Sequence, residues 1–87
     1  MTSPIVHING TSADALVDGY MSAAEAVDAA IRAMYETSPH ARDYYLIDGL
    51  YTKAIEEHAS RVDRLRAVSD ELKSLVVAVI ESEEGRG

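Results

Sequence analysis

The sequence predicts an all-α fold: an antiparallel two-helix hairpin with a short extended N-terminal arm, which assembles into a helical-bundle oligomer. Apolar residues recur at alternating spacings of three and four in two long stretches, the pattern of a helix with one buried face. A polar loop with two adjacent tyrosines separates the stretches. We expect an arm and turn at residues 1–11, a helical hairpin at 12–83 and a frayed tail at 84–87.

The arm is expected to be extended as far as a turn at Asn9 and Gly10. Pro4 and the β-branched residues after it disfavour a helix, whereas Asn and Gly both tolerate positive φ. The first helix is predicted at 12–37, where the hydroxyl of Ser12 can cap the free N–H groups of the first turn. Its apolar face contains Leu16, Tyr20, Ala23 or Ala24, Val27, Ile31 and Met34.

The loop is predicted at 38–48 and the second helix at 49–83. Pro39 restricts the residue before it to extended conformations, which ends the first helix. Asp48 is the expected N-cap of the second helix. The apolar face of that helix contains Tyr51, Ala54 or Ile55, His58, Val62, Leu65, Val68, Leu72, Leu75 or Val76, and Val79.

The predicted helices differ in length, at roughly 37 Å and roughly 52 Å. Folded back, the first helix would cover the second only to about Ser74, which would leave the apolar residues 75–80 exposed. The arm could cover this segment, a second hairpin could dock on it, and we expect both. The predicted oligomer interface is Leu65, Leu72, Leu75, Val76 and Val79.

Composition supports oligomerisation and excludes several functional classes. A chain of 87 residues without cysteine has no disulfide or thiolate metal site to supplement its small core, so association is the remaining route. A net charge of -7 disfavours binding to DNA or RNA. We expect no signal peptide, no membrane segment, and a location in the cytoplasm of a bacterial host.

The sequence contains no pattern typical of catalysis. It has no Gly-rich phosphate loop, and His7, His40 and His58 are not at metal-ligand spacing on one element. We therefore expect that the protein is not an enzyme and that it uses no cofactor or metal.

Two segments are candidates for binding an anionic ligand. His7, Asn9, Thr11 and Ser12 precede a helix N-terminus, where free N–H groups attract anions, although an ordinary capped turn explains them too. In the loop, Arg42 can pair with a phosphate while Tyr44 and Tyr45 stack on a planar base. The alternative is that these tyrosines plug the end of the helix pair. One hairpin would hold the two segments roughly 37 Å apart, but an antiparallel dimer could bring them together.

The start His7-Ile8-Asn9-Gly10-Thr11-Ser12, the turn Ala41-Arg42-Asp43-Tyr44-Tyr45 and the stretch from Glu56 to Leu65 resemble a group of small phage and prophage proteins. Those proteins look like helical hairpins with an NGTS-like start and an ARDYY-like turn. Their turn often has a proline after the tyrosines, where this chain has Leu46, so the loop geometry is expected to differ. In size, class and setting the chain is also similar to small helical phage oligomers, which include sponges that sequester cyclic nucleotide immune signals.

Together these features predict a non-enzymatic phage-type binding protein that captures a small phosphorylated, nucleotide-like signal between protomers, as a counter-defence sponge. Its expected partners are itself, as a dimer or larger homo-oligomer, and a nucleotide-type small molecule, with no nucleic acid and no membrane. The alternative is an interaction or inhibitor protein whose apolar helix face docks a host or phage protein. A third possibility is an accessory protein of the virion.

Overall fold

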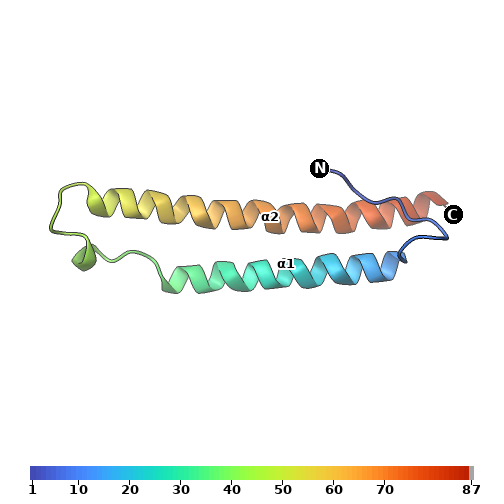
Figure 1. Ribbon diagram of the computed structural model, residues 1–87, viewed down its shortest axis with the longest axis horizontal. Coiled ribbons are helices and arrows are strands. Elements are labelled where there is room, and N and C mark those ends of the chain that lie inside the picture. Colours follow the sequence, from blue (N-terminus) through green and yellow to red (C-terminus); the bar gives the residue numbers. More distant parts are fainter. Residues whose placement is uncertain (87) are drawn as a thin grey trace.

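The chain folds into two long antiparallel helices that lie side by side and are joined by one loop, with the N-terminal arm folded against the end of the second helix (Figure 1). The computed structural model describes residues 1–86. Helix α1 spans Ala13–Glu36, a 3₁₀ turn η1 spans Ala41–Asp43, and helix α2 spans Leu50–Arg86. The predicted all-α hairpin is therefore confirmed, and no strand occurs among residues 1–86.

Helix α1 begins and ends close to where the sequence predicts. The Ser12 side chain accepts a hydrogen bond from the Ala15 N–H at 3.2 Å, so Ser12 is the N-cap. Ala24 and Ile31 are buried against α2, at a spacing of seven residues that keeps them on one face. At the C-terminal end the Thr37 N–H donates to the Met34 carbonyl, and Pro39 follows two residues later.

The second helix begins one residue later than predicted and continues further. Gly49 has a φ of 80° and its carbonyl accepts the Lys53 N–H, so Gly49 and not Asp48 occupies the N-cap position. Only glycine adopts this φ without steric cost, which explains why the chain reverses here. The expected end at residue 83 is too early, because α2 continues through residues 84–86 where a frayed tail was predicted. Residue 87 lies outside the described residues.

The extra length of α2 lies at the loop end, so the prediction that α1 covers α2 only to about Ser74 is wrong, although Val77 and Ile80 remain 53% and 43% exposed. Val79 is in contact with the start of α1 at Ala13 and is 0% exposed. At the other end, the first turns of α2 extend past α1 and lie beside the loop (Figure 1). The prediction assumed that the chain turns back directly after α1. Instead residues 38–48 run onward before α2 begins.

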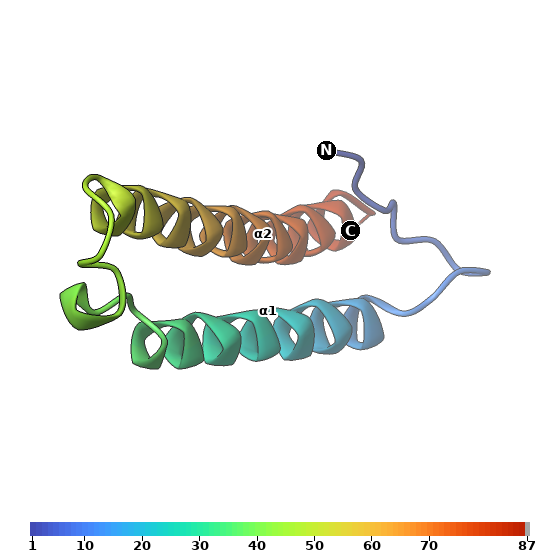
Figure 2. The same ribbon diagram turned by 60° about the vertical axis from the view of Figure 1, so that its left-hand side comes forward.

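The arm closes the open end of the hairpin and forms a small core with both helices. Val6 is 5% exposed and packs with Ala13 and Val79, while the Val6 N–H donates to the Ser82 hydroxyl at 2.8 Å. Leu16, Val17 and Tyr20 surround this cluster. Figure 2 shows the arm leaving α1 and turning back toward the C-terminal end of α2. The predicted covering by the arm is thus present within a single protomer.

The result is a rod with little interior. It measures 63 × 19 × 16 Å and its radius of gyration is 18.9 Å, against about 12 Å for a compact domain of this length. Among the described residues no helix is both long enough and apolar enough to cross a bilayer.

Candidate functional site

The predicted ligand residues at the arm lie on the surface in an ordinary capped turn. His7, Asn9, Thr11 and Ser12 are all exposed. The Gly10 N–H donates to the His7 carbonyl at 3.1 Å, and the Ser12 side chain takes the Ala15 N–H. These polar groups therefore close the turn and cap the first turn of α1, as expected for an ordinary capped turn.

At the loop end, one of the three predicted ligand residues is packed and two are exposed. The Tyr44 ring stacks on Tyr51 of α2, with ring centroids 6.3 Å apart and an interplanar angle of 29°. Arg42 and Tyr45 point into solvent, and Tyr45 is 74% exposed. Tyr44 therefore helps to fix the loop on α2, as the plug alternative predicts.

A shallow hollow of about 280 Å³ lies next to Tyr44. Cationic side chains of α2, Lys53 and Arg61, line it with His58, whose Nε2 is 3.4 Å from the Ser38 hydroxyl. Glu57 also lines it and pairs with Arg61 at 3.7 Å. Arg42 and Tyr45 do not line this hollow. Of the three ligand residues predicted in the loop, only Tyr44 lies beside the cationic side chains.

The two predicted ligand segments lie at opposite ends of a rod 63 Å long. A single protomer does not bring them together, as the sequence already implied. A shared ligand site would need a second protomer in antiparallel orientation, and that site stays a prediction.

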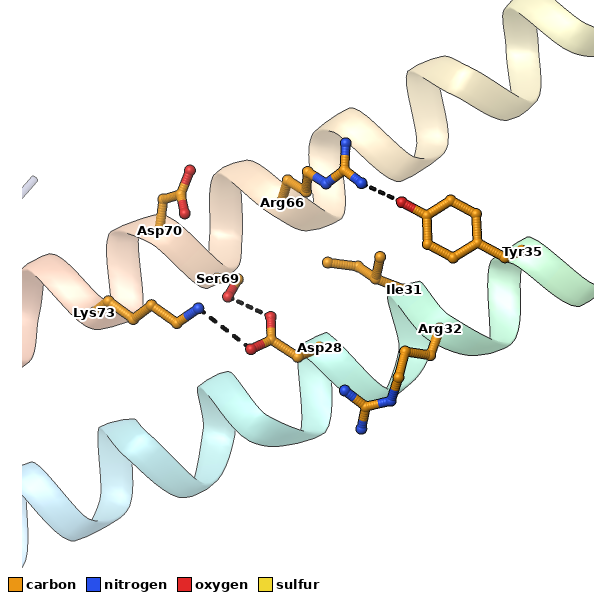
Figure 3. Close-up of a pocket in the computed structure, with 8 residues that line it drawn as sticks. All are labelled: Asp28, Ile31, Arg32, Tyr35, Arg66, Ser69, Asp70 and Lys73. Carbon is orange, nitrogen blue, oxygen red and sulfur yellow. Dashed lines mark hydrogen bonds and ion pairs between the residues drawn. The ribbon is translucent and has the colours of Figure 1, made fainter.

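A polar cluster joins the helices near the middle of the rod (Figure 3). The Ser69 hydroxyl donates to Asp28 Oδ1 at 2.7 Å, and Lys73 Nζ lies 3.3 Å from Asp28 Oδ2. One turn away, the Arg66 guanidinium donates to the Tyr35 hydroxyl. An open cavity of about 360 Å³ lies over these groups, and Arg32 and Asp70 also line it.

The hydrogen bonds and the ion pair of this cluster join α1 to α2. The hydrogen bond from Ser69, together with Lys73, lowers the pKa of Asp28 below its ordinary value of 3.8, so the carboxylate is charged at neutral pH. Ser69 is only 2% exposed, so its hydroxyl is out of reach of a molecule in solvent, and its hydrogen bond to Asp28 joins the two helices. Such bonds exist only when Asp28 lies level with Ser69 and Lys73, so they favour one register of the two helices.

The sequence carries a signal for this cluster, because each of its two central residues interrupts a run of apolar positions. Ser69 lies seven residues after Val62 and seven before Val76, in the middle of the apolar face of α2. Asp28 follows the buried Ala24 by four residues, so it too interrupts an apolar face. A polar residue at such a position needs a partner, and each of these two is the partner of the other.

The opposite side of the hairpin lacks this polar character. All charged residues of α1 recur at spacings of three, four or seven, which confines them to one side of that helix; they are Asp14, Asp18, Glu25, Asp28, Arg32 and Glu36. Away from them, α1 exposes only small residues: Ala15, Gly19, Ser22, Ala23, Ala26, Ala30 and Ala33.

Apolar side chains of α2 adjoin this small-residue face. Met34 of α1 and Leu65 and Val68 of α2 line an open, mainly apolar groove of about 450 Å³, and Arg61 and Arg64 line it as well. Leu65 and Leu72 are half-buried, and Val68 is 45% exposed. We call the small-residue face of α1 together with Leu65, Val68 and Leu72 the uncharged side.

The predicted oligomer interface overlaps only partly with this surface. Leu65, Leu72, Leu75 and Val76 keep part of their surface exposed, because α1 covers one flank of each of them. Val79 is fully buried by the arm and α1, so a partner could reach it only if the arm moved. Contact of Val79 with a partner therefore stays a prediction that requires the arm to move.

The described residues contain no group of three His, Cys, Asp or Glu side chains that could hold a metal ion. Comparisons with family models, curated proteins and solved structures found no match to this chain. The resemblance to small phage proteins thus stays a prediction.

Proposed function

We propose that the chain is a non-enzymatic interaction protein that works by docking a helix against its uncharged side. This is the alternative that the sequence left open, and a single observation supports it most strongly. On α1 the fully exposed residues divide into a half that carries the charged side chains and a half of small uncharged residues from Ala15 to Ala33, flanked by the half-buried Leu16, Val27 and Met34.

Solvent alone gives no reason for such a division. A solvated helix face normally presents charged and polar side chains, whereas a helix that packs closely on another presents small or apolar ones. Small side chains also let two helix backbones approach closely. The neighbouring Leu65, Val68 and Leu72 add apolar surface that becomes more stable when it is removed from water.

Helix docking can be tested with two variants that each introduce one negative charge, one on the uncharged side of α1 and one near its charged half. Ala26→Glu puts a carboxylate in the centre of the uncharged side, and Ala29→Glu makes the same change near the charged half. The probe is a designed amphipathic peptide of alanine and leucine, and binding is measured by fluorescence anisotropy beside self-association by light scattering. Circular dichroism confirms that both variants remain helical.

Ala26→Glu should weaken binding of the peptide or of a second copy by at least about tenfold, because an unpaired charge would be buried. Ala29→Glu should bind as the original chain does. If neither the peptide nor a second copy binds the original chain, or if both variants bind equally well, helix docking is not the function.

Capture of a small phosphorylated ligand is a second candidate, supported by the hollow that contains Tyr44, Lys53 and Arg61. An aromatic ring beside two cations is suited to a base and a phosphate. Thermal shift with a panel of cyclic and ADP-ribose-type nucleotides tests it. If a nucleotide raises Tm, and Lys53→Ala and Arg61→Ala each remove this increase, the result would support capture of a phosphorylated ligand. If no nucleotide raises Tm, this candidate function is rejected. A role as a phage counter-defence sponge depends on this result.

A further inference from the structure

We infer that the helix docked on the uncharged side is α1 of a second copy of this chain, in antiparallel orientation, so that two hairpins form a four-helix bundle. The inference rests on the proposed function and names its partner. Three observations lead to a second copy rather than an unrelated helix.

The first observation is the amount of exposed surface. The protomer exposes 6303 Å², whereas a compact protein of 9.4 kDa exposes about 5,000 Å². A specific interface removes about 800 Å² from each partner. A dimer interface of ordinary size would therefore bring this chain close to the surface expected for its mass.

The second observation is that the small-residue face of α1 is complementary to itself. When two copies of α1 run antiparallel with Ala23 against the partner's Ala26, each larger side chain along the face meets a small one. The resulting pairs are Ser22 with the partner's Val27, Leu16 with the partner's Ala33, and Ala15 with the partner's Met34. A two-fold axis repeats every pair, as an interface between identical chains requires.

In the same register Gly19 meets the partner's Ala30. In the protomer nothing lies within 4 Å of the position where a Cβ of Gly19 would be, so this site is open. Two such small residues let the helix axes approach closely at that level. Antiparallel packing also sets the N-terminus of each α1 beside the C-terminus of the other, where the opposite ends of the helix dipoles attract.

The third observation concerns the two ends of the rod. The apolar groove of Met34, Leu65 and Val68 lies toward the loop end, while the exposed Ile5 and Ile8 belong to the arm at the opposite end. A protomer cannot bring its own arm to its own groove. Antiparallel pairing places the arm of each copy at the level of the groove of the other.

Charge is compatible with this arrangement. A chain with net charge -7 repels its own copies, and the repulsion is least when charged side chains stay away from the contact. The acidic residues of α1 lie on the half that faces away from the uncharged side, so they remain in solvent in the dimer.

The absence of native cysteine makes a crosslinking test direct. Gly19→Cys and Ala30→Cys are prepared as two separate variants and oxidised alone and as an equal mixture. The two positions are about 16 Å apart along one helix. A disulfide requires Cα atoms within about 7 Å.

An antiparallel dimer in this register forms a disulfide only in the mixture, between Gly19→Cys of one chain and Ala30→Cys of the other. Parallel pairing would crosslink each variant to itself, and that result would overturn the inference. Glu25→Cys, on the charged half, is the control and should not crosslink in any combination.

Light scattering on the unmodified chain separates failure of this inference from failure of the proposed function. A dimer of about twice the protomer mass is expected. A monomer that still binds the amphipathic peptide would overturn the second copy as partner and leave helix docking intact. A monomer that binds no helix would overturn both.

Discussion

The Ser69 hydroxyl donates a hydrogen bond of 2.7 Å to Asp28 Oδ1 and so links the two helices at the middle of the rod. Ser69 is 2% exposed, whereas Asp28 also reaches Lys73 at the edge of the interface. Because each bond needs Asp28 at one level of α2, the cluster selects a single register from several that a repeating apolar face would allow.

The first prediction follows from the lowered pKa of Asp28. Its folded-state pKa lies below the ordinary 3.8 that applies to the unfolded chain, so ionised Asp28 contributes stability above that pH. The contribution is lost as the pH falls from 3.8 through the folded-state pKa. Asp28→Asn should therefore lower Tm at pH 7, and the difference from the original chain should narrow below pH 3.8.

Thermal unfolding from pH 7 to pH 2, at fixed protein concentration, measures this. Asp18→Asn, at an exposed position on the same half of α1, is the matched control and should change Tm little. A gap between Asp28→Asn and the original chain that stays constant down to pH 2 would contradict the role of the ionised carboxylate.

The second prediction concerns the core that the arm completes. Val79→Ala removes two methyl groups from a side chain that is 0% exposed, and it should lower the free energy of unfolding by about 2 kcal/mol. Val77→Ala, at a position 53% exposed, should have little effect. Urea denaturation at one protein concentration measures both, and equal effects would mean that the arm does not bury Val79 in solution.

The fold was largely predictable from the sequence because its information is local. The three-four spacing identified both helices, the Ser12 hydroxyl located the start of α1, and Pro39 located its end within a few residues. These signals depend on backbone sterics and helix geometry alone, so they act in any tertiary context.

The relative placement of the helices was not predictable in the same way. Residues 38–48 run onward past the end of α1 before α2 begins (Figure 1), and there Tyr44 stacks on Tyr51, a contact that no helix-spacing or capping signal in the sequence specifies. The positions of the candidate ligand residues were not predictable either. Arg42 and Tyr44 are neighbours in sequence, but only Tyr44 lines the hollow beside Lys53, because a 3₁₀ turn at Ala41–Asp43 separates their directions.

The third prediction separates the two tyrosines of the loop. Tyr44→Ala removes the stack on Tyr51 and should lower the free energy of unfolding by about 1 kcal/mol. Tyr45→Ala, which changes a side chain 74% exposed, should stay within about 0.5 kcal/mol of the original chain. If Tyr44 served only to bind a ligand and did not plug the end of the helix pair, its removal would leave stability unchanged. A Tyr44→Ala variant that unfolds in urea as the original chain does would support that interpretation.

The fourth prediction concerns the start of α2. Gly49 has a φ of 80°, and nothing lies within 4 Å of where its Cβ would be, so a substitution there meets only the backbone cost. Gly49→Ala should lower the free energy of unfolding by roughly 1–2 kcal/mol, the cost of a left-handed conformation for an L-residue. Gly49→Asn should lose less, because asparagine tolerates this conformation through local hydrogen bonds. Urea denaturation of the pair gives the answer, since a steric or packing role for Gly49 would penalise the larger asparagine more than alanine.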